Sequence, residues 1–204
     1  SGFVTENSQT VILKSPEYAS ENEVVYIASY YQLFEKAVYG KQGVEAIGEY
    51  CNVASLVDSY IFNEWTANHD AGLTSTYLYK PADDTLYAGP VWDFDLTMGN
   101  CLASYYTVYN NVGGSGKSCE GIYCNVDWFR YFNRVPEFEE MRNERYLELQ
   151  SEIVNLYTDT GAGKNYMDTV LDTYGDSFAR NYDEAGWKVD VVYSSLERIP
   201  DKTY

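Results

Sequence analysis

The sequence is short of basic residues and of long apolar runs, and both shortages exclude classes of protein. Lys and Arg number 14 against 31 Asp and Glu, which gives a formal net charge of −17 at pH 7. A surface of this sign repels phosphate backbones, so we expect no nucleic acid partner. No stretch approaches the roughly 20 consecutive apolar residues of a transmembrane helix, so we expect no membrane span.

Histidine and cysteine are also scarce. The single histidine is His69, and the four cysteines contain no CxxC pair, which argues against a zinc site. The cysteines favour disulfide bonds and an extracytoplasmic location, with free thiols as the alternative. Cys119 and Cys124 are close enough in the sequence to close a small loop. The pairing stays open for all four candidates: Cys51, Cys101, Cys119 and Cys124.

Tyrosine is the residue that the chain has in excess. There are 22 Tyr against 8 Phe and 4 Trp. Each Tyr adds apolar area together with a hydroxyl that needs a partner. Most of them fall in periodic segments, so we interpret them as core and boundary residues, with rings that stack on sugars as the alternative. The chain of 204 residues is long enough for a single domain that buries roughly 70% of its unfolded surface.

Hydrophobic periodicity and capping signals predict a mainly helical protein. Ser20 and Glu23 form a capping box, and apolar residues at helical spacing continue from there to Gly40. Residues 53–67 show the same periodicity and predict a second helix. Three more helices are predicted over residues 128–132, 137–156 and 165–182.

Strand signals are limited to short segments. Residues 74–80 and 86–91 alternate around a turn at 82–84, which predicts a β-hairpin. A short apolar strand is predicted at residues 11–13, ahead of the first helix. The Gly-, Ser- and Asn-rich stretch 102–125 predicts a long surface loop. The expected fold class is therefore α+β and predominantly helical.

Two aspartates lie at the two ends of the predicted hairpin. Asp70 precedes it and Asp93 follows it, and because a hairpin folds its ends back together, we expect both carboxylates at one site. Asp93 lies between Trp92 and Phe94, whose bulk is expected to bury it, and a buried carboxylate needs a cation or hydrogen-bond donors. We therefore interpret Asp93 as a metal ligand. Asp95 would share the ion or cap nearby amides.

Polar residues near Asp70 are candidates for supporting roles. Asn63 and Asn68 could steady the turn or contact the metal ion, and satisfied buried amides are the simpler alternative. Ser75 lies five residues after Asp70, where protein kinases place an Asn for a second Mg²⁺, and a hydroxyl is a weaker ligand. Trp92 is a further candidate, either for contact with a nucleotide or for support of the residues that bind it.

The segment from Asn63 to Asn100 resembles a known family signature. Its sequence, NEWTANHDAGLTSTYLYKPADDTLYAGPVWDFDLTMGN, is similar to the core of the CotH family, the spore-coat-protein-H-like atypical protein kinases. A weaker likeness runs from residues 11–16 to Trp128, Phe129, residues 136–138 and Trp187. It therefore spans most of the chain.

The resemblance implies a specific chemistry. It implies transfer of the ATP γ-phosphate to Ser or Thr hydroxyls of secreted or surface proteins, with Mg²⁺ or Mn²⁺. Asp70 matches the catalytic Asp of the family and Asp93 the metal-binding Asp. The implied fold is the C-terminal lobe of an atypical protein kinase, with a short β-hairpin that carries the catalytic turns. The implied location is extracellular, on the cell surface or in the spore coat.

The resemblance also bears on domain organisation. Relatives are longer at the N-terminus, so we expect residues 1–204 to be one CotH kinase-like domain fragment, the large lobe, with the N-terminal lobe missing. Such a fragment is expected to be inactive or weakly active and to belong to a larger extracellular multi-domain protein. The alternative is a non-catalytic scaffold or carbohydrate-binding module, in which the acidic turn binds structural Ca²⁺.

Overall fold

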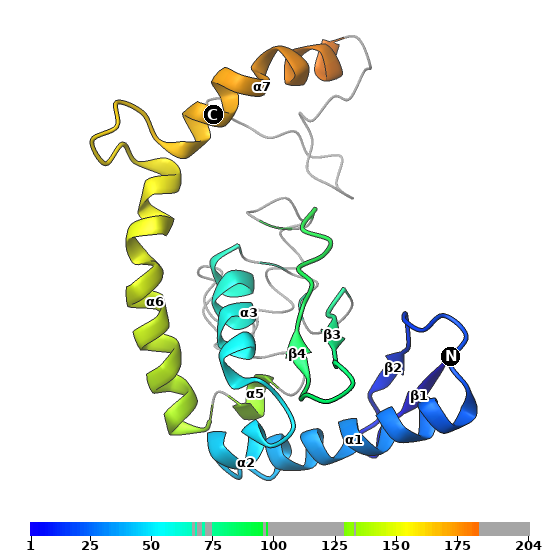
Figure 1. The fold of residues 1–204 in the computed structure, drawn as a ribbon. Helices are drawn as coiled ribbons and strands as arrows, with labels where there is room; N and C mark the ends of the chain where they lie inside the picture. Colours follow the sequence, from blue (N-terminus) through cyan, green and yellow to red (C-terminus); the bar gives the residue numbers. More distant parts are fainter. Residues whose placement is uncertain are drawn as a thin grey trace, which may run out of the picture.

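Helices make up most of the structure (Figure 1). The computed structural model describes residues 1–66, 68, 71, 75–95, 97, 129–132 and 134–183. Its helices are α1 (Glu21–Tyr39), α2 (Val44–Gly48), α3 (Val53–Trp65), α5 (Phe129–Phe132), α6 (Pro136–Tyr157) and α7 (Tyr166–Asp183). Its strands are β1 (Gly2–Val4), β2 (Thr10–Ile12), β3 (Leu78–Tyr79) and β4 (Tyr87–Ala88). The expected α+β class with a predominance of helix is confirmed.

The long helices begin where the sequence predicts. At the start of α1, the Ser20 hydroxyl accepts a hydrogen bond from the Glu23 amide at 3.3 Å, and the Glu23 carboxylate accepts one from the Ser20 amide at 2.7 Å. This is the predicted capping box, which satisfies amides that the first turn leaves unpaired. The Asn52 side chain caps α3 in the same way, by accepting a bond from the Ser55 amide at 2.9 Å.

The strands form two separate antiparallel pairs, β1 with β2 and β3 with β4. The hairpin strands are much shorter than the predicted 74–80 and 86–91, although their register, Leu78 opposite Ala88, confirms the hairpin itself. The arms end early because Ser75 has a positive φ of 48° and Pro90, after Gly89, has no amide to donate. The predicted loop at residues 102–125 lies outside the described residues.

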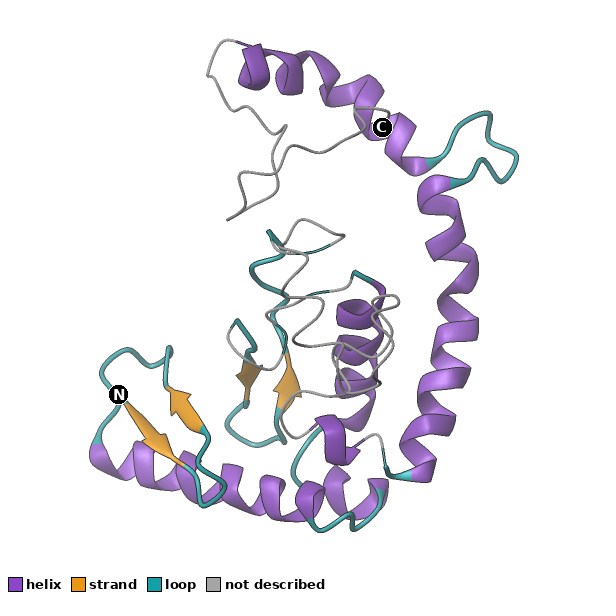
Figure 2. Ribbon diagram, turned by 180° about the vertical axis from the view of Figure 1, so that it is seen from behind, coloured by secondary structure: helices purple, strands orange, loops and turns teal. Residues whose placement is uncertain are grey.

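Three long helices lie around the β3–β4 hairpin on three of its sides (Figures 1 and 2). In Figures 1 and 2, α1, α6 and α7 form three sides, and α3 lies inside them beside β3 and β4. The first half of α6 packs against α3, and the second half leads to α7. Several large apolar side chains of α7 are exposed: Tyr166, Met167, Leu171, Tyr174 and Phe178. No helix in the described part of the chain is both long enough and apolar enough to cross a membrane.

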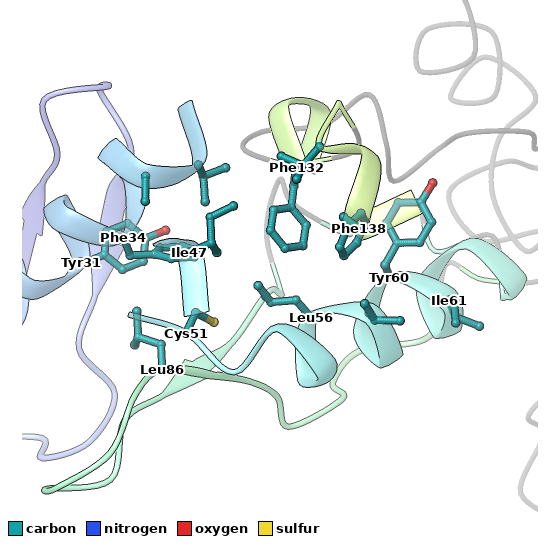
Figure 3. Packing of buried hydrophobic residues seen from close by; sticks show 14 of the residues in the cluster. Tyr31, Phe34, Ile47, Cys51, Leu56, Tyr60, Ile61, Leu86, Phe132 and Phe138 are labelled. Carbon is teal, nitrogen blue, oxygen red and sulfur yellow. The ribbon is translucent and has the colours of Figure 1, made fainter. Parts of the chain in front are cut away.

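The hydrophobic core lies where α1, α2, α3, α5 and the start of α6 meet (Figure 3). Phe34, Phe132 and Phe138 are fully buried there. The rings of Phe132 and Phe138 are 3.9 Å apart between centroids, and Tyr60 of α3 meets Phe138 edge to face at 5.8 Å. Aromatic contacts of this kind stabilise the fold beyond simple area burial. This cluster therefore joins α3, α5 and α6.

Backbone hydrogen bonds attach the hairpin to the start of α3. The Asn52 amide donates to the Leu86 carbonyl at 2.7 Å, and the Leu86 amide donates to the Tyr50 carbonyl at 2.9 Å. The Ala88 amide donates to the Ser55 hydroxyl at 3.0 Å. Leu86 itself is buried in the core. The strand that leads to Asp93 is therefore fixed to α3 and the core at Leu86 and Ala88, a few residues before the acidic turn.

Candidate functional site

The two ends of the hairpin meet through a hydrogen bond between Ser75 and Asp93. The Ser75 hydroxyl donates to Asp93 Oδ2 at 3.0 Å, across 18 residues of sequence. Both residues have positive φ, 48° and 64°. Such a conformation is uncommon for residues other than Gly, and Asp tolerates it better than most. Ser75 and Asp93, both with left-handed backbone conformations, are therefore linked through their side chains. This link lies where the sequence predicts a functional site.

The surroundings of Asp93 differ from the sequence prediction. Asp93 is exposed, and Trp92 is 58% exposed, so the neighbouring aromatic rings do not bury the carboxylate. The two rings instead pair with other rings: Trp92 meets Tyr77 at 6.1 Å, and Phe94 meets Phe62 of α3 at 5.0 Å. The expectation of a buried Asp93 is wrong because both flanking rings find aromatic partners away from the carboxylate.

The turn that leads to Asp70 is held by two buried amides. Asn68 Nδ2 donates to Asn63 Oδ1 at 2.8 Å, and the Asn68 amide donates to the Asn63 carbonyl at 3.0 Å. Asn63 Nδ2 in turn donates to the Ser59 carbonyl at 2.7 Å. These bonds fit the role of steadying the turn. Asp70 lies outside the described residues, so its distance from Asp93 stays a prediction.

A divalent cation fits the site in one specific mode. Asp93 and Asp95 are both exposed, and Asp93 accepts the Ser75 bond through Oδ2. Among the described residues, no group of three or more His, Cys, Asp and Glu gathers closely enough to hold a metal ion. Mg²⁺ needs no such cage, because it is usually held by one or two carboxylates together with waters and substrate phosphates. An accessible carboxylate at the mouth of a turn matches that mode.

A cavity of about 620 Å³ lies directly beside Asp93. One wall is the face of α3 that carries Phe62 and Asn63, and the others are the two arms of the hairpin, including Ser75. The cavity size is that of a typical small-ligand pocket. Its apolar lining comes mainly from large side chains: Phe62, Tyr77, Tyr79, Val91, Trp92 and Phe94.

An ion pair at the edge of this cavity connects α6 to α3. Arg145 Nε donates to Asp58 Oδ1 at 2.7 Å, and Arg145 Nη1 donates to Glu148 at 2.9 Å. These two carboxylates raise the pKa of the Arg145 guanidinium above its ordinary value, and the hydrogen bond with Asp58 has the larger effect. The sequence does not reveal this contact, because Asp58 and Arg145 are 87 residues apart in the chain and neither belongs to a motif.

Of the four cysteines, only Cys51 lies in the described part of the chain. Cys51 is fully buried, and its thiol is free. It lies in the core next to Leu86, with which it forms an isolated parallel bridge. Cys101, Cys119 and Cys124 lie outside the described residues, so their predicted pairing is untested. Cys51 is therefore a core residue in this structure and takes part in no disulfide there.

We expect the Cys51 thiol to be unreactive while the chain is folded. Burial raises its pKa to about 12, whereas a thiol in the unfolded chain ionises near 8.5. Because the thiolate is the nucleophile, alkylation of Cys51 at pH 8.5 should be at least about tenfold slower in buffer than in denaturant, as measured by peptide mapping. Equal rates would contradict the burial.

The same shift gives a sign for the pH dependence of stability. The unfolded chain loses the Cys51 proton at lower pH than the folded chain does. The contribution to folding is therefore complete below about pH 8.5 and is lost as the pH rises toward 12. In a Cys51→Ala variant, the free energy of unfolding should therefore fall less as the pH rises from about 8.5 toward 12, because the thiol is absent.

Comparison with known proteins identifies the class. The family model described as CotH kinase protein matches residues 2–169, which is most of the chain. No curated protein and no solved structure matches it. The match contains the whole described site, from Asn63 to Asp95. The chain belongs to the CotH kinase family.

Proposed function

We propose that this protein transfers the γ-phosphoryl group of ATP to Ser or Thr hydroxyls of secreted or surface proteins, with Mg²⁺ or Mn²⁺ as the cation. The observation that carries the proposal is the exposed Asp93 carboxylate, fixed by Ser75 at the mouth of the hairpin, in a member of the CotH kinase family. Phosphoryl transfer depends mainly on positioning and on charge stabilisation, so one well-placed carboxylate can have a large effect.

The residues divide into three roles. Asp93, with Asp95 as a second candidate, would hold the divalent cation, which neutralises charge on the nucleotide phosphates when bound. Asp70 would orient the acceptor hydroxyl and take its proton, as a general base does. Asn63 and Asn68 support this role indirectly, because their bonds fix the end of α3 from which residue 70 follows.

Charge supports a strong dependence on the cation. The chain carries a formal net charge of −17, and ATP is itself polyanionic. Among the residues that line the cavity beside Asp93 there is no Lys, Arg or His. A nucleotide would therefore be repelled unless a divalent ion joins it to the carboxylate.

Location and partners follow from the family as proposals. CotH proteins are associated with the spore coat, which favours an acceptor protein on a spore or cell surface. We propose that the domain acts there as part of a larger extracellular assembly. The acidity of the chain fits this location, since it keeps a surface protein soluble and repels nucleic acid.

The direct test is phosphoryl transfer by the protein in its natural length, with residues 1–204 included. Labelled ATP and a mixture of Ser- and Thr-containing acceptors should give product with Mg²⁺ or Mn²⁺ and none with a chelator. Ca²⁺ distinguishes the non-catalytic alternative, because a structural Ca²⁺ site would raise the melting temperature without any transfer. Transfer that persists in the chelator would contradict the proposal.

A further inference from the structure

The cavity beside Asp93 has a mainly apolar lining, and three of its polar side chains, Asn63, Ser75 and Asp58, are already paired. Asn63 bonds to Ser59 and Asn68, and the Ser75 hydroxyl bonds to Asp93. Asp58, at the edge, is held by Arg145 at 2.7 Å. A ligand that used the amide of Asn63 or the hydroxyl proton of Ser75 would have to compete with these existing bonds. The cavity therefore favours an apolar ligand group.

Charge excludes phosphates and carboxylates from the same space. The lining residues include no cation, and the nearby Arg145 is engaged by both Asp58 and Glu148. An anionic group would enter beside Asp58 and Asp93 with nothing to compensate it. The phosphate end of a nucleotide therefore belongs at Asp93 with its cation, outside this cavity.

Large apolar side chains continue from the cavity onto its rim. Tyr79 is 51%, Val91 61% and Trp92 58% exposed, and all three also line the cavity. Such neighbouring exposed residues would lose water contact if an apolar side chain entered between them. The rim also reaches the reaction centre, since Trp92 and Phe94 flank Asp93 directly.

We propose that this cavity binds a large apolar side chain of the acceptor polypeptide, a few residues from the hydroxyl that is phosphorylated. The inference rests on the proposed function and adds to it the substrate feature that the site selects. Continuity with Asp93 sets the spacing, because an extended chain covers only about 3.5 Å per residue. A neutral apolar side chain meets no charge repulsion in the cavity and displaces no existing hydrogen bond.

The test uses a set of short peptides with a central Ser, Ala at the flanking positions and a Lys at each end. One Phe replaces Ala at each flanking position in turn. At one or two positions, Phe should raise kcat/KM by about tenfold or more over the all-Ala peptide, since this is the scale for burying such a side chain. Fluorescence anisotropy without nucleotide should show the same preference in binding.

Matched variants locate the preference. Val91→Asp places a charge at the cavity mouth and should remove the Phe preference, while Leu147→Asp makes the same kind of change on α6, outside the cavity, and should keep it. Both residues are more than 60% exposed, at 61% and 66%, so neither change disturbs the core. Tyr79→Ala, also on the rim, should weaken the preference and provides a second variant.

The outcomes are distinguishable from those of the proposed function. Transfer at equal rates to the Phe and Ala peptides would overturn this inference and leave the function standing. Preferential binding without transfer to any peptide would count against the function and not against the cavity. Displacement of the Phe peptide by adenosine would assign the cavity to a nucleobase, which would overturn the inference. Loss of the preference in Leu147→Asp would also overturn it.

Discussion

Replacing Asp93 with Asn should reduce phosphoryl transfer by at least about a hundredfold, the scale found when one charge-stabilising group is removed from a transition state. The change removes the negative charge proposed to hold the cation. It keeps an oxygen that can accept the 3.0 Å bond from Ser75. Asn also tolerates the φ of 64° found here, whereas Ala does so poorly, so Asn separates chemistry from backbone strain.

Asp83→Asn is the matched control for this experiment. Asp83 is an exposed aspartate in the turn of the same hairpin, and the change removes the same charge. Transfer by this variant should stay within about twofold of the parent, because exposed charges away from the site are screened. Binding of Mn²⁺ in the presence of ATP, followed by electron paramagnetic resonance, should weaken in Asp93→Asn and not in Asp83→Asn. Full transfer activity in Asp93→Asn would remove Asp93 from the mechanism.

Replacing Phe138 with Ala should lower the free energy of unfolding by about 3–5 kcal/mol, the range measured for large aromatic side chains in cores. Phe138 is fully buried in the first turn of α6 and contacts Phe132 and Tyr60, so its removal leaves a cavity where α3, α5 and α6 meet. Domains of this size are usually stable by only about 5–15 kcal/mol. The variant should therefore unfold at a much lower urea concentration.

Leu147→Ala provides the control on the same helix. Leu147 is 66% exposed, so its truncation removes little buried area and should change the unfolding free energy by no more than about 0.5 kcal/mol. The urea midpoint, measured with an unchanged slope, is the quantity to compare. Similar losses in Phe138→Ala and Leu147→Ala would show that the core is not where the structure places it.

The helices could be predicted from the sequence because their signals are local. The capping box at Ser20 and the periodic apolar residues after it define α1, and similar periodicity gave α3, α6 and α7 within one or two residues. Helix α2 was missed because five residues are too few for a periodic pattern. Strand β1 was missed as a strand because its pairing with β2 depends on a turn and not on its own three residues.

The sequence names candidate residues for the site, and it does not show their contacts. The likeness of the segment from Asn63 to Asn100 to the CotH signature singled out Asp93, and the family match bears out that resemblance. The exposure of Asp93 could not be read from its neighbours, because it depends on which rings Trp92 and Phe94 meet across the fold. The bond to Ser75 depends on two left-handed residues, which the sequence does not mark.

The attachment of the hairpin to the start of α3 has a consequence for local opening. The Asn52 and Leu86 amides are tied into bonds that cross between α3 and the hairpin, and Leu86 belongs to the core. Exchange of these amide hydrogens with solvent deuterium therefore requires the core itself to open. The start of β4 therefore cannot separate from α3 while the core stays closed.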